Sequence, residues 1–191
     1  MKVASFEVHA VPQDTSPWSL SERVGILLWS IVWPLLCGWT PKPLNAWRLS
    51  WLRIFGCTIY GKPFIHQRAR IQVPWRLRLH HRACVGDRAN LYSLGEIELG
   101  PGCVVAQEAY LCTGTHDFSD PNMALLTARI AIGANAFVGA RAFIMPGVRV
   151  GDEAVVGACA LVTENVAEKT VVAGSPARFL RFRESPVLEP N

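Results

Sequence analysis

An aliphatic residue recurs at every sixth position in the second half of the chain. The residues are Ile132, Val138, Ile144, Val150, Val156 and Val162. A small or branched residue stands two positions before each of them: Ile130, Ala136, Ala142, Val148, Ala154 and Ala160. Residues i and i−2 of an extended chain point the same way, so each unit predicts a short strand followed by a corner. A period of six is not the helix period, and an internal repeat of this kind decides the fold.

The same spacing continues upstream with one change of phase. Val85, Leu91 and Ile97 are six apart, and Leu99, Val105 and Leu111 continue the pattern after a shift of two. Glycine follows four of the later aliphatic residues, at Gly133, Gly139, Gly151 and Gly157, where we expect it to relax the backbone as the chain turns. The pattern predicts an all-β solenoid of stacked turns around one continuous apolar column.

The interval from Leu111 to Ile132 is 21 residues, which is not a multiple of six. Part of it must leave the solenoid, and we expect an excursion loop near residues 112–129. With 191 residues, 50% hydrophobic and 18% charged, the chain suits one folded domain. We expect an N-terminal arm with one or two helices (1–58), the β-helix (59–170) and a closing segment (171–191).

The N-terminal arm is predicted to hold two helices. Ser19 or Ser21 is expected to cap a helix from near Glu22, and a second helix is expected over residues 44–55 with Gly56 as its stop. Residues 24–39 are nearly all apolar, but this stretch is shorter than a bilayer span and contains Pro34. We therefore expect a helix packed on the coil or on a neighbouring subunit.

An alternative is that the 24–39 segment lies at a membrane surface, with Trp29 and Trp33 at headgroup depth. Nine Lys or Arg and no Asp or Glu occur between Lys42 and Arg82, a basic block that could face anionic lipid. No cleavable signal peptide is recognised, and the six cysteines lack metal-type spacing. We expect reduced thiols in a cytoplasmic protein, with peripheral contact to the inner membrane face as the open question.

His116 is the sharpest candidate for chemistry, since it is the only histidine in the half that carries the regular repeats and it opens the excursion. The segment TGTHDFSDP around it resembles the one that follows an outward-turning coil in hexapeptide-repeat acetyltransferases. The chain is similar over nearly its whole length to the colanic acid biosynthesis acetyltransferase family. That likeness is carried by SERVGILLWS, NAWRLSWLRIFG, VPWRLRL, LYSLGEIELG, AYLCTGTHDFSDP, LLTARIAIG, VVGACALVTENV and VVAGSPAR.

The resemblance implies a left-handed parallel β-helix, three of which pack as a homotrimer with cofactor and acceptor in the grooves between them. It implies an acetyl-CoA-dependent O-acetyltransferase that modifies a sugar hydroxyl of a cell-surface polysaccharide precursor or a related glycoside. His116 would be the general base, because a hydroxyl is a poor nucleophile and imidazole is the side chain suited to take its proton near neutral pH. The acetyl group would pass directly to the acceptor, without a covalent enzyme intermediate.

The resemblance also implies roles for further residues. A backbone N–H at Gly139 or Ala140 would stabilise the oxyanion. The corner residues Ala140, Ala158 and Thr163 would hold the pantetheine arm, although any tight solenoid prefers small residues at its corners. Asn90, Tyr92 and Asp117 are the candidates for the substrate site, with Asp117 either orienting the imidazole or ordering the loop. Arg178 and Arg181 would bind coenzyme A phosphates, although Glu164 stands where relatives often have a lysine.

Two other functions remain open from the residues. One branch of left-handed β-helix proteins is a zinc carbonic anhydrase, which needs three histidine ligands. His80 and His81 are adjacent and would face opposite sides of a strand, and no histidine follows His116, so we expect no metal. The other function is a non-catalytic trimeric scaffold that binds a membrane or a protein partner. Nucleic-acid binding is not favoured, because no recognisable binding module accompanies the basic block.

Overall fold

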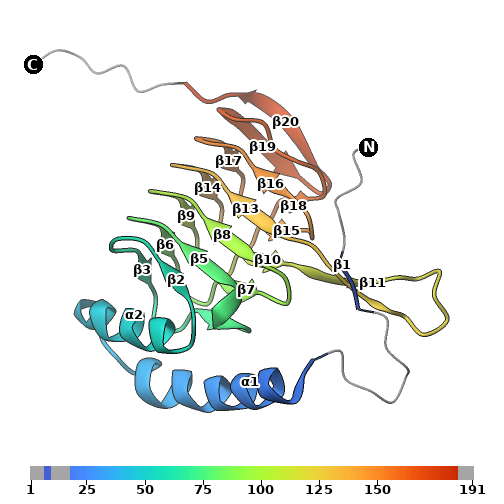
Figure 1. Ribbon diagram of the computed structural model, residues 1–191. Coiled ribbons are helices and arrows are strands. Elements are labelled where there is room, and N and C mark those ends of the chain that lie inside the picture. The colour runs from blue at the N-terminus through green and yellow to red at the C-terminus, as the bar shows by residue number, and fades with distance from the viewer. Residues whose placement is uncertain (1–6, 10–17, 185–191) are drawn as a thin grey trace, which may run out of the picture.

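The computed structural model describes residues 7–9 and 18–184, and its main body is a left-handed parallel β-helix (Figure 1). Each turn contributes one strand to each of three faces. The first face contains β2 (Thr58–Ile59), β5 (Leu77–Leu79), β8 (Ile97–Leu99), β13 (Ile130–Ile132) and β16 (Arg149–Val150). The second contains β3 (Phe64–Ile65), β6 (Cys84–Val85), β9 (Val104–Val105), β14 (Phe137–Val138), β17 (Val155–Val156), β19 (Thr170–Gly174) and β20 (Ala177–Phe182). The third contains β4 (Arg70–Ile71), β7 (Asn90–Tyr92), β10 (Tyr110–Cys112), β15 (Phe143–Ile144) and β18 (Leu161–Val162).

The core is the apolar column that the repeat predicts. On the first face, Leu79 pairs with Leu99, Leu99 with Ile132, and Ile132 with Val150, so four inward side chains form one stack. All four are almost completely buried. Full burial of such a side chain contributes about 1.5–3 kcal/mol relative to exposure, and the solenoid repeats this gain at every turn. The expected fold is confirmed.

The repeat glycines act differently from the expectation. Gly133, Gly139 and Gly151 do not have positive φ; the left-handed residues follow two positions later, for example Asn135 (φ 52°) and Arg141 (φ 59°). A Cβ on Gly139 would lie 2.6 Å from the nitrogen of Ala158 on the next turn. Glycine is therefore required because adjacent coils approach closely at the corner, and the expectation that it relaxes the turn was wrong.

The irregularities of the repeat all fall at the corner where the third face leads back to the first. Eight residues separate Ile71 from Leu79 and Leu91 from Leu99, 21 separate Leu111 from Ile132, and six separate Ile144 from Val150. One of the longer corners holds a 3-10 turn, Pro74–Arg76. The change of phase in the sequence is thus a lengthened corner, and the inward column continues through it.

The excursion is a β-hairpin arm. Strand β11 (Gly114–His116) pairs antiparallel with β12 (Leu125–Thr127), and β1 (Glu7–His9) adds to the other edge of β12. The hairpin projects away from the prism (Figure 1). The departure from the coil is confirmed, but strand pairing orders it, and one of its three strands comes from the opposite end of the sequence.

The N-terminal helices cap the first turn of the prism. Helix α1 (Leu20–Val32) begins at Ser19, which forms a capping box with Glu22. The chain continues through Pro34 as a π-turn, Trp33–Cys37, and then forms a 3-10 turn, Lys42–Leu44, and α2 (Asn45–Ile54). On length and composition, residues 20–37 make one described helix long and apolar enough to cross a membrane, and 17% of it is buried. Pro34 does not end the helical segment, which continues through it to Cys37.

The two tryptophans of α1 and its extension face the coil. Trp29 and Trp33 are buried, and their ring nitrogens donate to the carbonyl oxygens of Ile71 (2.8 Å) and Ala69 (3.0 Å) in the first turn. The alternative that these two tryptophans lie at headgroup depth is therefore wrong. Packing of the helix on the coil, the favoured interpretation, is confirmed.

The C-terminal closing segment is the hairpin of β19 and β20. Strand β19 pairs parallel with β17, and β20 pairs antiparallel with the outer edge of β19, so the last edge of the second face is covered.

All six cysteines are free thiols; Cys37, Cys57 and Cys103 are buried and Cys159 is exposed. Burial raises the pKa of Cys57 and Cys103 to about 12.

Candidate active site

His116 ends the first strand of the arm and is exposed to solvent. Its Nδ1 lies 2.7 Å from the carbonyl oxygen of Met123, across the hairpin. A carbonyl oxygen only accepts hydrogen bonds, so Nδ1 carries the hydrogen in this contact. In the neutral ring, Nε2 then has a free lone pair and is able to accept a proton.

The carboxylates near His116 hold the loop. Asp117 Oδ1 accepts from the backbone N–H of Ser119 (2.9 Å) and from its hydroxyl (2.5 Å). These hydrogen bonds lower the pKa of Asp117, and the hydroxyl contributes most. Asp120 accepts in the same way from the backbone of Asn122 (2.9 Å). Of the two roles left open for Asp117, the observed contacts are those that order the loop.

Two of the three predicted substrate residues lie on the third face, and Asp117 lies in the arm. Asn90 and Tyr92 belong to β7, beside β10. The ring of Tyr92 is 6.0 Å from that of Tyr110, which stacks on Phe143 at 4.8 Å with an interplanar angle of 12°. An outward aromatic ladder therefore runs along this face across β7, β10 and β15. The adjacent Ser93 is buried and bonded to Val73, so it supports the corner.

The two candidate oxyanion donors differ. The N–H of Gly139 already donates to Val156 O (2.8 Å) on the next turn. The N–H of Ala140 makes no hydrogen bond within the described part of the chain, while its carbonyl accepts from Cys159 N (2.9 Å). Ala158, one turn further, stands at the same corner between the second and third faces. Ala140 is thus the residue of the pair with an available donor.

The structure brings Thr163 and Arg178 together in one cleft of about 260 Å³, and Glu164 also lines it. Arg178 and Arg181 are three apart on β20, a spacing that would normally place them on opposite faces of a strand. A register shift lies between them: Arg178 pairs with Ala173 and Arg181 with Val171. Since residues 171 and 173 share a face, both arginines point to the same side.

His116 and Ala140 lie at different corners of the prism. The arm leaves where the third face leads to the first, whereas Ala140 stands where the second face leads to the third. The whole third face separates the two corners. The described residues of one chain therefore do not bring the predicted base and the predicted oxyanion donor together.

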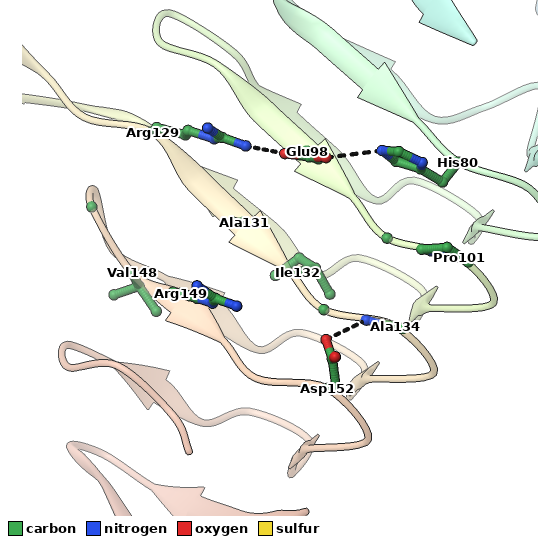
Figure 2. Close-up of a pocket in the computed structure, with 13 residues that line it drawn as sticks. His80, Glu98, Pro101, Arg129, Ala131, Ile132, Ala134, Val148, Arg149 and Asp152 are labelled. Atoms are coloured by element: carbon green, nitrogen blue, oxygen red, sulfur yellow. Dashed lines mark hydrogen bonds and ion pairs between the residues drawn. The ribbon is translucent and has the colours of Figure 1, made fainter. Parts of the chain in front are cut away.

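A larger pocket of about 580 Å³ lies on the first face (Figure 2). His80 Nε2 is 2.8 Å from Glu98 Oε1, and Arg129 pairs with the same carboxylate. The ring of Tyr60 stacks on His80 at 4.7 Å. The sequence did not identify this site, although Glu98 lies between two repeat residues, Ile97 and Leu99, and Arg129 precedes Ile130. Glu98 thus pairs with both His80 and Arg129, while Arg149 and Asp152 also line the pocket and Asp152 Oδ1 accepts from Ala134 N (2.8 Å).

The coil begins at β2, so His66, His80 and His81 also belong to it, although His116 is the only histidine in the half with the regular repeats. His66 lies 3.2 Å from Asp87, and His81 Nδ1 accepts from Lys62 N (3.2 Å). Across residues 7–9 and 18–184, no three His, Cys, Asp or Glu side chains are grouped so that they could hold a metal ion.

Comparison with known proteins identifies similar chains. Residues 129–164 match the family model described as "Hexapeptide repeat of succinyl-transferase". The chain is 38% identical over 177 residues to the Escherichia coli protein named "Putative colanic acid biosynthesis acetyltransferase WcaF", covering 90% of this chain and 97% of that one.

Two solved structures share the fold. A galactoside acetyltransferase in complex with coenzyme A has a TM-score of 0.80 at 18% identity, covering 88% of this chain and 86% of that chain. A hexapeptide-repeat acetyltransferase from Vibrio cholerae with acetyl coenzyme A has a TM-score of 0.78 at 18% identity, covering 89% and 93%.

Proposed function

Because this chain belongs to the family of hexapeptide-repeat acetyltransferases that includes WcaF, it is an acetyltransferase, and we propose that it moves an acetyl group from acetyl-CoA to a sugar hydroxyl. The acceptor class is a precursor of a cell-surface polysaccharide or a related glycoside. The similar folds that bind acetyl-CoA or coenzyme A support the donor, and the biosynthetic role named for WcaF supports the acceptor. The 2.7 Å contact between His116 and Met123 carries the proposal.

His116 acts as general base in this proposal. Its Nε2 accepts the hydroxyl proton as the sugar oxygen attacks the carbonyl carbon of the thioester. The new C–O bond forms first, and the C–S bond breaks as the tetrahedral intermediate collapses. Coenzyme A leaves as a thiolate and takes the proton from the imidazolium. Met123 O holds the ring and stabilises its charged form, because Nδ1–H donates to it throughout.

The N–H of Ala140 supplies the oxyanion contact. A preorganised backbone donor costs no reorganisation when charge develops, and removing one such donor typically costs about 10²–10³ in kcat. Gly139 contributes by having no side chain, since the close approach to the next turn holds the corner in place. Ala140 and Ala158 leave room for a thin pantetheine chain along the corner.

The phosphate end of coenzyme A lies near β20 in this proposal. Arg178 and Arg181 point the same way and are exposed, and neither makes an ion pair with another described residue. Thr163 shares a cleft with Arg178, which supports a path from the corner to the arginines. Glu164 in the same cleft disfavours an anion close to Thr163, so the phosphates lie toward β20.

The complete site forms between subunits of a homotrimer. The separate corners of His116 and Ala140 support this arrangement, because an arm that projects from one prism is able to reach the Ala140 corner of a neighbour. Asn90 and Tyr92 on β7 lie beside β10, the strand that leads into the arm, and Asp117 lies on the arm itself. These three residues would contact the acceptor, and the aromatic ladder offers sugar rings an apolar surface. Six free thiols support a reducing compartment, the cytoplasm, as the place of action.

Thiol release tests the proposal. The purified protein is given acetyl-CoA with a panel of free, nucleotide-linked and lipid-linked sugars, and coenzyme A is measured with a thiol reagent. We expect that coenzyme A is released only when a hydroxylated sugar is present. We also expect mass spectrometry to detect the acetylated sugar. A non-catalytic scaffold is the second candidate; it predicts no release with any acceptor, and deletion of the arm between Gly114 and Thr127 would leave its binding unchanged.

A further inference from the structure

Helix α1, its π-turn and α2 use one side to hold the end of the prism. Trp29 and Trp33 donate to the carbonyl oxygens of the first turn, and the buried guanidinium of Arg48 donates to Ile65 O at 2.8 Å. Asn45 accepts from Ile65 N (3.1 Å) and completes the contact. These bonds fix which side of the two helices faces away from the coil.

The outward side of α1 and its π-turn is aliphatic. Exposed apolar residues recur at helical spacing along the whole length, and two tryptophans flank the end: Leu20, Val24, Leu27, Leu28, Ile31, Leu35, Trp39 and Trp47. We call this set the outer apolar face. Leu20 is 75% exposed, Leu35 65% and Trp39 71%. The ring nitrogens of Trp39 and Trp47 donate to Leu35 O and Leu36 O (both 2.8 Å), which holds these rings beside the helix.

The charges around the outer apolar face have one sign. Arg23, Lys42 and Arg53 are exposed, and none of them forms an ion pair with another residue among 7–9 and 18–184. Glu22 is the only acidic residue between positions 18 and 86, and it is bonded to Arg76 (3.0 Å) and to Ser19. Among residues 18–86, the two helices and the turns between them therefore carry unpaired cations and no unpaired carboxylate.

From these contacts we propose that the outer apolar face docks on the anionic surface of a lipid bilayer. An aliphatic stripe with tryptophans at its end and unpaired cations beside it matches a helix that lies in the membrane interface. Each Lys or Arg near an anionic surface adds about 1 kcal/mol of attraction. The helix lies on the membrane and does not cross it, because the bonds of Trp29 and Trp33 to the first turn hold it against the prism.

Charge argues against a second copy of this chain as the occupant. Two such faces would bring unpaired cations of the same sign together, with no free carboxylate to pair them. An anionic lipid surface supplies the missing charge and the apolar phase at once. The proposal does not depend on the acetyl acceptor, since it concerns the opposite side of the helices from the coil.

Vesicle sedimentation tests the proposal. The full chain is mixed with vesicles of equal parts phosphatidylglycerol and phosphatidylcholine, or of phosphatidylcholine alone, at low salt. Binding to the anionic vesicles is expected to exceed binding to the neutral ones and to weaken as salt is added. The double variant Leu27→Gln/Ile31→Gln is expected to bind about tenfold more weakly or worse, because two aliphatic side chains no longer enter the interface.

The matched control is Phe179→Gln, which removes an exposed apolar side chain from β20 at the other end of the prism. It should sediment with vesicles like the native chain, and circular dichroism should be unchanged for every variant. Absence of binding to anionic vesicles at low salt overturns the proposal. So does native-like binding by the double variant, or a change of its oligomeric state without lipid, which would assign this face to a protein contact.

Discussion

Nδ1 of His116 lies 2.7 Å from the carbonyl oxygen of Met123, and this contact joins the two ends of the loop at the tip of the arm beside the backbone bond from Asp117 N to Ala124 O (2.9 Å). It fixes the orientation of the imidazole and leaves Nε2 free. Met123 has positive φ (52°), so the backbone is bent where its carbonyl meets the ring. The side chains of Asp117 and Asp120 hold the same loop through backbone N–H groups.

The close approach of adjacent coils at Gly139 predicts a stability effect. Gly139→Ala places a methyl group 2.6 Å from Ala158 N, so the coils must separate, at a cost of about 1–3 kcal/mol. The midpoint of thermal unfolding should fall, measured by circular dichroism at equal protein concentration. Gly95→Ala is the control, since its nearest contacts are at 3.4 Å. Equal midpoints for the two variants would contradict the packing role of Gly139.

The buried Arg48 is expected to stabilise the helical cap. Its guanidinium donates to Ile65 O, Thr40 Oγ1, Pro41 O and Lys42 O. Arg48→Met leaves these acceptors without their donor and should cost about 3 kcal/mol or more in urea unfolding. Arg53→Met, on the exposed side of α2, should change stability by less than about 0.5 kcal/mol. A small effect at Arg48 would mean that the cap is held by apolar contacts alone.

Thiol reactivity reports on the coil and on the cofactor groove. Burial raises the pKa of Cys57 and Cys103 to about 12, so at pH 8 they hold almost no thiolate and should not react with a disulfide reagent until the chain unfolds. Cys159 is exposed and should react in the native state. Because it adjoins Ala158, coenzyme A should slow its reaction, whereas free pantothenate should not. Unchanged labelling with saturating coenzyme A would place the pantetheine elsewhere.

The register shift in the C-terminal hairpin predicts paired action of two arginines. Arg178→Ala and Arg181→Ala should each raise the apparent KM for acetyl-CoA, and the double variant should raise it about tenfold or more with kcat little changed. Lys62→Ala removes an exposed cation far from this hairpin and serves as the control. If the double variant has the native KM, the phosphates do not bind at β20.

The regular repeat made the coil predictable, because each inward aliphatic residue from Ile132 to Val162 has one possible place in a stack. The helix N-cap at Ser19 was also predictable, because it depends only on residues within the first turn of the helix. The strand pairing of the arm could not be predicted in this way. Strand β1 joins β12 from more than 100 positions away, and no spacing rule links Glu7 to Thr127. The roles of the repeat glycines also depend on the neighbouring turn, which a single hexad does not contain.

The candidate site was likewise predictable only in part from the sequence. His116 was recognisable from its place at the start of the excursion, but its hydrogen bond to Met123 depends on the fold of the arm. The choice between Gly139 and Ala140 required the hydrogen bond of Gly139 to Val156. The common face of Arg178 and Arg181 arises from a register shift that their spacing of three does not reveal. The spacing of four correctly placed Trp29 and Trp33 on one side of the helix. It did not show that this side packs against the coil, because that depends on the tertiary structure.

The proposed base can be tested directly by comparing His116→Ala with the native chain in the thiol-release assay. The variant should fold and assemble like the native protein, while kcat/KM for acetyl transfer falls by about 10²–10⁴. His81→Ala, which removes an exposed histidine from a corner of the coil, should keep native activity. Transfer by His116→Ala within a few-fold of the native rate would contradict the assignment of His116 as the base.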